Sequence, residues 1–228
     1  MKHLFFAILT VFVLANAASA GAEPAQADVL SLSGEVSVRK AGQTEWSAAS
    51  EGTMLSEGDT IRTGKDAFAE LSMDEGDNII ASLGGDTSAI LRGKTLERVE
   101  LSGGSIRSLV KKLGRGSSFE IKTPTLVAAA RGSGWDVDYD GESTTVKAFE
   151  DNISVESIDE NGKVLQKVSL RPDFQVSIDR HRKFGDNKLI KAADRNKWKQ
   201  WKNMKRMPRK NIKGKMCPKP GGAKTRRR

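Results

Sequence analysis

Residues 119–157 read FEIKTPTLVAAARGSGWDVDYDGESTTVKAFEDNISVES and decide the fold class. Apolar and polar side chains alternate through this stretch with a period of two, the pattern of strands that bury one face. Turn residues interrupt the alternation at Thr123-Pro124, at residues 131–134 and at residues 139–142. Short alternating runs separated by turns predict successive β-strands and exclude a long helix.

The same pattern extends over most of the chain. Short runs with turns about every ten residues predict one all-β domain at residues 28–179, solenoid-like or sandwich-like. Residues 105–113 are ambiguous, because their apolar positions also have helical spacing; strands on both sides favour a strand there. Residues 33–38, 103–108 and 151–155 resemble one another loosely, which hints at stacked repeats.

The N-terminus has the pattern of a secretory signal peptide. Lys2 precedes an apolar run at residues 4–14, and an Ala-x-Ala ending predicts a signal peptide at residues 1–20, cleaved after Ala20. The alternative is a retained anchor, but the run is shorter than the ~20 residues that a membrane span needs. We therefore expect a periplasmic or secreted protein without a transmembrane span in its mature form.

Charge divides the chain into two parts. Residues 21–179 contain 17 Lys and Arg against 27 Asp and Glu, a net charge of −10. Residues 180–228 contain 20 against 2, a net charge of +18, and Lys2 completes the total of +9. This asymmetry predicts an acidic domain that carries a basic interaction tail.

The basic part is predicted to begin with an amphipathic helix at residues 187–207, with Asp186 or Asn187 as N-cap. One arc of this helix is apolar and comprises Leu189, Ile190, Ala193, Trp201, Met204 and Met207, with Trp198 at its edge. The opposite arc is basic and comprises Lys188, Lys191, Arg195, Lys199, Lys202, Lys205 and Arg206.

Residues 208–228 contain almost nothing apolar and are predicted to be disordered. Their charge includes Arg209, Lys210, Arg226, Arg227 and Arg228. Cys217 is the single cysteine and cannot form an internal disulfide.

The helix and tail are the strongest candidates for an interaction. A basic amphipathic helix with two tryptophans suits an anionic membrane surface, and polybasic segments bind polyanions through charge. The competing interpretation is that the apolar arc packs on the β-domain and the lysines are merely solvated. Export disfavours nucleic acid, so the expected partners are an anionic envelope polymer, an acidic phospholipid surface or an acidic protein.

Three motifs give the chain a resemblance to the FecR domain family of bacterial periplasmic β-rich domains. They are Gly58-Asp59 with the strand after it, Thr123-Pro124, and Arg131-Gly132, followed by a strand at residues 149–155. The resemblance covers about residues 28–157 and implies an exported module for binding or scaffolding. No cofactor is expected. The best-known members are transmembrane regulators with an anti-sigma region. Here the signal sequence is expected to lead directly into the β-domain, so iron-dicitrate signalling is not implied.

Arg131 is the candidate structural or ligand-binding residue of this region. Its guanidinium is expected to brace a turn through backbone carbonyls, with ligand contact as the alternative. Gly132 and Gly134 are expected to supply unusual backbone angles.

Neither a metal site nor catalysis is predicted. Asp136, Asp138 and Asp140 mimic the start of a calcium loop, but Lys147 occupies the twelfth position, and a hairpin with exposed acids explains them. Ser133 has no histidine of the domain as a base, since His3 lies in the signal sequence and His181 beside the tail. Two hypotheses remain: a scaffold tethered by its basic tail, and a sensor whose β-domain binds a small ligand or receptor.

Overall fold

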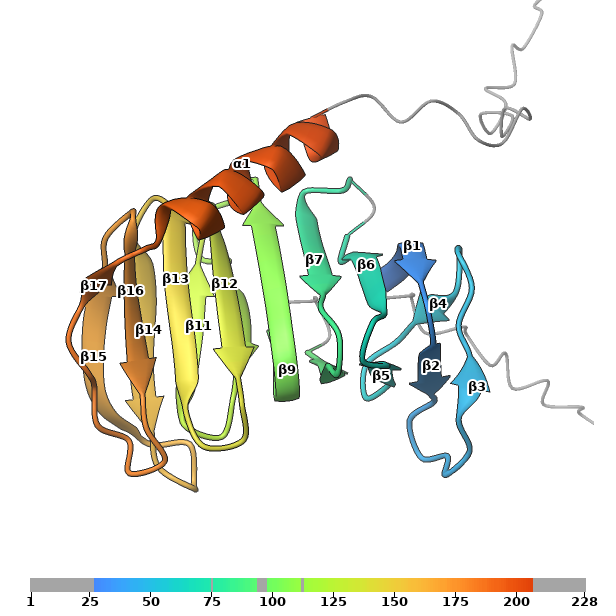
Figure 1. Ribbon diagram of the computed structural model, residues 1–228. Helices are drawn as coiled ribbons and strands as arrows, with labels where there is room; N and C mark the ends of the chain where they lie inside the picture. Colours follow the sequence, from blue (N-terminus) through green and yellow to red (C-terminus); the bar gives the residue numbers. More distant parts are fainter. Residues whose placement is uncertain (1–26, 75, 94–97, 112, 207–228) are drawn as a thin grey trace, which may run out of the picture.

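The chain forms two β-sheets that share one strand (Figure 1). The computed structural model describes residues 27–74, 76–93, 98–111 and 113–206. Within these residues, seventeen strands are followed by helix α1 (Ala192–Arg206), so the all-β prediction is confirmed. The predicted signal peptide with Ala20 and the predicted tail at residues 208–228, with Cys217, lie outside the described residues.

In each sheet the strands follow one another from edge to edge in the following order. Sheet A contains β4 (Met54–Leu55), β1 (Ala27–Ser33), β6 (Phe68–Ser72), β7 (Ile79–Leu83), β9 (Arg98–Val110), β12 (Ser133–Tyr139), β13 (Thr144–Glu150), β16 (Phe174–Ile178) and β17 (Lys188–Leu189). Sheet B contains β3 (Ser47–Ala48), β2 (Val36–Arg39), β5 (Thr60–Thr63), β8 (Ser88–Arg92), β9, β10 (Phe119–Lys122), β11 (Leu126–Ala130), β14 (Ile153–Ile158) and β15 (Val164–Leu170).

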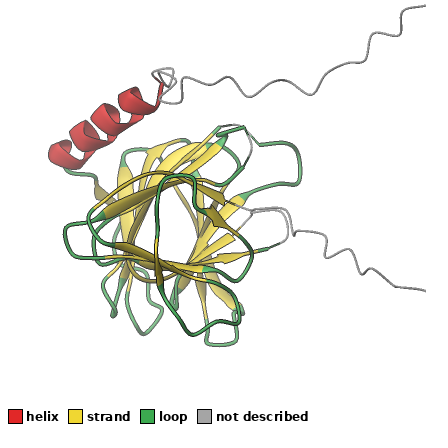
Figure 2. Cartoon of the chain, turned by 90° about the vertical axis from the view of Figure 1, so that its right-hand side faces the viewer, coloured by secondary structure: helices red, strands yellow, loops and turns green. Residues whose placement is uncertain are grey.

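The chain advances along the long axis of the molecule while it passes back and forth between the sheets. From β10 onward, each antiparallel hairpin in one sheet is followed by a hairpin in the other. Figure 1 shows this progression from β1 at one end to β15–β17 at the other, and Figure 2 shows the two layers viewed along that axis. The fold therefore has two facing sheets, as in a sandwich, and sequential addition of strands, as in a solenoid.

Strand β9 is the strand that belongs to both sheets. Residues 98–103 pair with β8 and β10 in sheet B, and residues 104–110 pair with β7 and β12 in sheet A. The change of sheet occurs at Gly104, whose φ of 86° is accessible to glycine and strained for other residues. The strand predicted within residues 105–113 is thus confirmed for residues 105–110.

The three loosely similar segments mark places where the chain passes from one sheet to the other. Gly34 lies between β1 and β2, Gly104 within β9, and Asp151 between β13 and β14, and all three have positive φ, at 77°, 86° and 46°. In each segment a buried aliphatic side chain follows two residues later, at Val36, Ile106 and Ile153. The shared pattern therefore encodes a repeated crossing between sheets.

The core lies between the two sheets and is formed by alternate residues of their strands. Trp135 of sheet A and Phe119 of sheet B are both fully buried, and their ring centroids are 5.9 Å apart. Aromatic side chains bury the largest areas per residue, so this pair is a major contributor to the attraction between the sheets.

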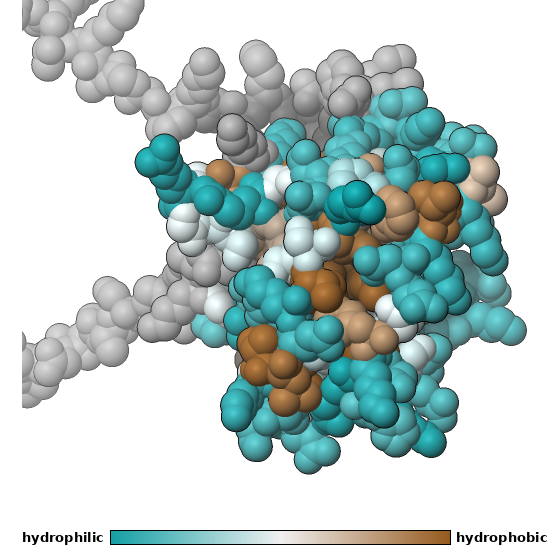
Figure 3. All heavy atoms as spheres, turned by 90° about the vertical axis from the view of Figure 1, so that its left-hand side faces the viewer, coloured by the Kyte–Doolittle hydropathy of each residue, from teal (hydrophilic) through white to brown (hydrophobic). Residues whose placement is uncertain are grey.

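The end of the sandwich formed by β15–β17 exposes apolar side chains. Val164 and Leu165 on β15 and Leu189 on β17 are about half exposed or more, and Phe174 and Phe184 are half-buried at the end of the core. Figure 3 looks at this end and shows apolar side chains gathered among polar ones.

The predicted start of the helix is wrong. Residues 188–189 form β17, which pairs with Phe174 and Gln175 at the edge of sheet A, and α1 begins only at Ala192. Neither Asp186 nor Asn187 therefore serves as its N-cap. The backbone of this segment forms hydrogen bonds with the otherwise unpaired edge of β16. Helical spacing of apolar residues in the sequence does not reveal such an edge, so the pairing could not be predicted.

We predict that Gly104→Ala destabilises the domain by about 2–5 kcal/mol, because it combines left-handed strain with overpacking. A Cβ at Gly104 would lie 2.7 Å from the carbonyl oxygen of Asp86 and closer still to Thr87. Chemical denaturation measures the change. Gly103→Ala is the matched control, since a Cβ there meets nothing within 4 Å; equal stability losses in the two variants would contradict this explanation of the crossing.

Candidate functional site

The Gly58-Asp59 motif forms a braced turn at the start of β5. Gly58 has a φ of 86°, and the buried carboxylate of Asp59 accepts hydrogen bonds from Lys40 Nζ at 2.8 Å and from the backbone N–H groups of Ala41 and Ser56 at 2.9 Å each. Burial raises the pKa of Asp59, but these donors outweigh it and hold the pKa below its ordinary value. The motif holds three backbone segments together.

The Thr123-Pro124 motif forms the turn between β10 and β11. The Thr123 hydroxyl lies 2.9 Å from that of Thr144 on β13, and Thr125 lies 2.8 Å from the same hydroxyl. All three threonines are buried. The turn thus fastens sheet B to sheet A through a small network of hydroxyl groups.

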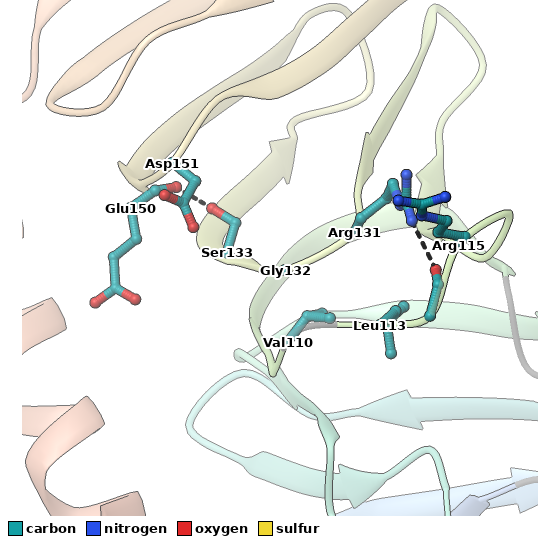
Figure 4. Close-up of a pocket in the computed structure, with 9 residues that line it drawn as sticks. Val110, Leu113, Arg115, Arg131, Gly132, Ser133, Glu150 and Asp151 are labelled. Atoms are coloured by element: carbon teal, nitrogen blue, oxygen red, sulfur yellow. Dashed lines mark hydrogen bonds between the residues drawn. The ribbon is translucent and has the colours of Figure 1, made fainter.

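The Arg131-Gly132 motif lies in the turn from β11 to β12 and lines a pocket of about 900 Å³. The Arg131 guanidinium donates a hydrogen bond of 2.9 Å to the Gly114 carbonyl oxygen, as a turn brace should (Figure 4). Gly132 and Gly134 were expected to need unusual backbone angles, and neither has a positive φ. Gly134 is instead required for packing, because the absence of a side chain at this position leaves space for helix α1.

Helix α1 docks on the outer face of sheet A (Figures 1 and 2). Trp198 is buried and stacks on Phe149 of β13 with ring centroids 4.8 Å apart and an interplanar angle of 2°. A Cβ at Gly134 would overlap the Trp198 ring, so the missing side chain of Gly134 makes room for it. The docking creates a second, smaller apolar cluster outside the main core.

This cluster contains residues from β1, β7, β9, β13 and α1 and from the segment just before the helix. Its buried members are Ile80, Phe149, Ile190, Trp198 and Trp201, with Leu30 and Leu109 packed against them. Sheet A is therefore apolar on both faces beneath the helix. That is why the apolar residues of the strand at residues 106–110 have helical spacing: Ile106 and Val110 face the main core, while Leu109 faces α1.

Arg107 of β9 lies at the centre of the docking surface. Its guanidinium donates two hydrogen bonds, of 2.8 and 2.7 Å, to the carboxylate of Asp136 and lies 5.7–5.9 Å from the ring centroids of Phe149, Trp198 and Trp201. Burial raises the pKa of Asp136 above its ordinary value, against the opposing effect of Arg107. Asp136 thus belongs to the helix dock, and Asp140 caps the β12–β13 turn by accepting the N–H groups of Glu142 and Ser143.

Ion pairs fix the register of α1 on the sheet. Lys202 contacts the Glu150 carboxylate, to which Trp198 Nε1 also donates, and Lys205 contacts Glu70, which accepts from Trp201 Nε1 at 3.3 Å. Lys147 of β13 pairs with Asp194 at 2.8 Å. The polar groups at the rim of the second cluster are thereby satisfied.

The predicted basic residues divide into three groups. Lys188, Lys191 and Lys199 are exposed, whereas Lys202 and Lys205 pair with the domain, as Arg195 does with Asp173 at 3.7 Å. The side chain of Arg206 and the remaining predicted residues, Arg209, Lys210, Arg226, Arg227 and Arg228, lie outside the described part of the structure.

The predicted apolar arc is partly wrong. Ile190 and Trp201 pack on the domain as one interpretation expected, and Trp198 is a central contact instead of an edge residue. Met204 is 59% exposed and Leu189 is 64% exposed. The arc shifted because Leu189 and Ile190 belong to the strand segment before the helix and because Trp198 fits the space above Gly134.

Residues 59–154 match the family model described as "FecR protein". The chain contains a FecR domain. The match begins at the Asp59 turn and ends in β14, so β15–β17 and α1 lie outside it.

Two solved structures share this fold. Two crystal structures of a "putative anti-sigma factor" from Parabacteroides distasonis are 17% and 16% identical to this chain, with TM-scores of 0.50 and 0.51. Each alignment covers 62% of this chain, and the chain spans about 64% of the length of those proteins. A comparison with curated proteins finds no match.

Sequence reasoning missed several residues that hold α1 on the domain. Glu70, Arg107, Phe149 and Glu150 form the dock for α1, and the signal for them was an outward apolar side chain, at Leu109 and Phe149, in strands that should alternate. Among the described residues, no helix is long and apolar enough to cross a membrane, and no cluster of His, Cys, Asp and Glu could hold a metal ion.

Asp59→Asn should destabilise the FecR domain by about 1–3 kcal/mol at pH 7, since the amide cannot accept all of the hydrogen bonds of the carboxylate. The folded pKa of Asp59 is lowered, so its charge stabilises the fold above the unfolded pKa, about 4, and this contribution disappears as pH falls through the folded value. Denaturation of both proteins from pH 7 to pH 2.5 measures the difference. A difference that stays constant with pH would contradict the role of the charge.

Gly134→Ala should undock α1, because the new methyl group takes the place of the Trp198 ring. At an overpacking cost of about 1–3 kcal/mol, the α1 amides should exchange with solvent roughly 5- to 150-fold faster. Hydrogen exchange of residues 192–206 measures the effect. Gly185→Ala is the control, since a Cβ there meets only an ordinary contact at 3.5 Å. Unchanged exchange of the α1 amides in Gly134→Ala would refute the proposed role of Gly134 in making room for Trp198.

Proposed function

We propose that this protein is a non-enzymatic, exported FecR-domain module that serves as a binding scaffold, held at a polyanionic component of the cell envelope by its basic C-terminus. The observation that carries the proposal is that α1 packs on the domain through Trp198 and Trp201. Its apolar face is therefore occupied, and attraction for an external partner comes from charge.

The ion pairs of α1 support this division. Lys202 and Lys205 are largely covered and are paired with carboxylates of the domain. By contrast, residues 207–228 contain nine Lys and Arg and no Asp or Glu. Exposed Lys188, Lys191 and Lys199 add to this charge on the helix side of the molecule. Each basic residue near an anionic surface contributes about 1 kcal/mol, so the C-terminal segment is sufficient for a strong, salt-sensitive attachment.

A binding role fits the chemistry of the domain better than catalysis. The glycine-flanked Ser133 donates its hydroxyl to the Glu150 carbonyl oxygen, an interaction within the turn. Asp136, whose pKa is raised by burial, is held by Arg107 in the helix dock. These side chains stabilise structure. The signal-like residues 1–20 support export, and export directs the search for partners to the envelope.

The test is removal of the charge beyond the helix. A chain in which every Lys and Arg of residues 207–228 is Gln should bind envelope fractions and anionic phospholipid vesicles at least 10-fold more weakly than the natural chain. Salt at ~0.5 M should release the natural chain, because screening lengths fall below about 8 Å. Co-sedimentation measures both effects.

A scrambled tail of unchanged composition is the matched control and should bind as the natural tail does, since charge has no sequence requirement. Thermal unfolding should be the same for all three chains, because α1 is intact in each. Retained binding by the Gln variant in ~0.5 M salt would refute the electrostatic attachment.

A further inference from the structure

A second binding site is suggested by the pocket beside the Arg131 turn. Its walls come from the end of β9, from the loop around residue 114 and from the turns before β12 and after β13 (Figure 4). Val110 and Leu113 supply apolar lining, and the charged residues are Arg115, Arg131, Glu150 and Asp151. A volume of about 900 Å³ is within the usual range of small-molecule sites.

Arg131 is held in place at this pocket. Its guanidinium donates to the Gly114 carbonyl oxygen at 2.9 Å, and its own carbonyl oxygen accepts the Leu113 N–H at 2.6 Å. The two backbone segments are thus tied together, and the hydrogen bond to Gly114 restrains the guanidinium at the pocket. A fixed guanidinium loses little conformational entropy when it binds a ligand.

Arg115 brings a second guanidinium to the same wall. It directly follows Gly114, in a turn that closes with Gly116 at a φ of 90°. Both arginine side chains line the pocket (Figure 4), and Arg131 bonds to the carbonyl of the residue that precedes Arg115. Both guanidinium groups are positively charged, so an anion in the pocket is attracted to both.

The acidic residues of the pocket do not neutralise these arginines. Within the described residues, neither Arg115 nor Arg131 forms an ion pair, whereas Arg92, Arg98 and Arg107 all pair with carboxylates. The Glu150 carboxylate is directed to Trp198 and Lys202 of α1, and Asp151 lies on the opposite wall (Figure 4). The arginine wall therefore has donors and positive charge available.

We propose that Arg115 and Arg131 bind the oxyanion of a small molecule, either a carboxylate or a phosphate group. Guanidinium groups suit both, because their paired N–H donors match two oxygens of the anion. Val110 and Leu113 contact the apolar part of the ligand, and Asp151 accepts a hydrogen bond from a ligand donor on the far side. The site lies on the FecR domain itself and does not depend on attachment through residues 207–228.

The experiment uses the full chain with two probes, inorganic phosphate and malonate, followed by amide chemical shifts. The natural chain should show saturable shifts at residues 113–116 and 131–133. Arg115→Gln should raise the Kd of the bound probe at least 10-fold. Within the described residues the Arg115 side chain forms no hydrogen bond or ion pair whose loss would weaken folding, so a purely structural role predicts no change.

Arg131→Gln should have a similar effect on the Kd, and Lys163→Gln, which removes one exposed charge elsewhere, should leave it within twofold. Saturation by phosphate alone assigns a phosphorylated ligand, and saturation by malonate alone assigns a carboxylate ligand; either supports the site. Shifts confined to residues 188–228, no saturation by either probe, or an unchanged Kd in Arg115→Gln would overturn the proposal.

Discussion

The fold depends on one strand that belongs to two sheets. Because β9 changes sheet at Gly104, the chain on either side of it can add strands to both layers and close a core between them. The same strand then presents alternate residues to opposite sides of sheet A: Ile106 to the core, and Arg107 and Leu109 to the surface that α1 covers. The crossing therefore determines both the main core and the dock of the helix.

The attachment of α1 combines two kinds of interaction of unequal weight. Burial of Trp198 and Trp201 against Phe149 contributes roughly 1.5–3 kcal/mol for each large apolar side chain. Ion pairs between covered side chains gain little net stability because desolvation opposes the attraction, so Lys202–Glu150 and Lys205–Glu70 chiefly select the position of the helix. An acidic domain and a basic segment of the same chain thus attract one another, and the aromatic residues make that contact specific.

The sequence predicted the strands well because alternation and turn residues are local signals. The crossings at Gly34, Gly104 and Asp151 were visible as a weak repeat, although their meaning required the two sheets. The start of α1 and the position of Trp198 could not be predicted, since they depend on a free edge at β16 and on the space above Gly134. The pocket could not be predicted either, because Arg115 and Arg131 are separated in sequence and come together through the hydrogen bonds of Arg131 with Leu113 and Gly114.

In our proposal, the basic C-terminal part consists of a helix that packs on the domain and a segment that binds an anionic envelope component. Hydrogen exchange of the full chain, free and bound to anionic vesicles, tests this division most directly. The account predicts that the amides of residues 192–206 are equally protected in both states, because Trp198 and Trp201 stay on sheet A. A loss of protection in residues 192–206 and in the facing strand β13 on binding would contradict it, since the helix would then have left the domain for the membrane.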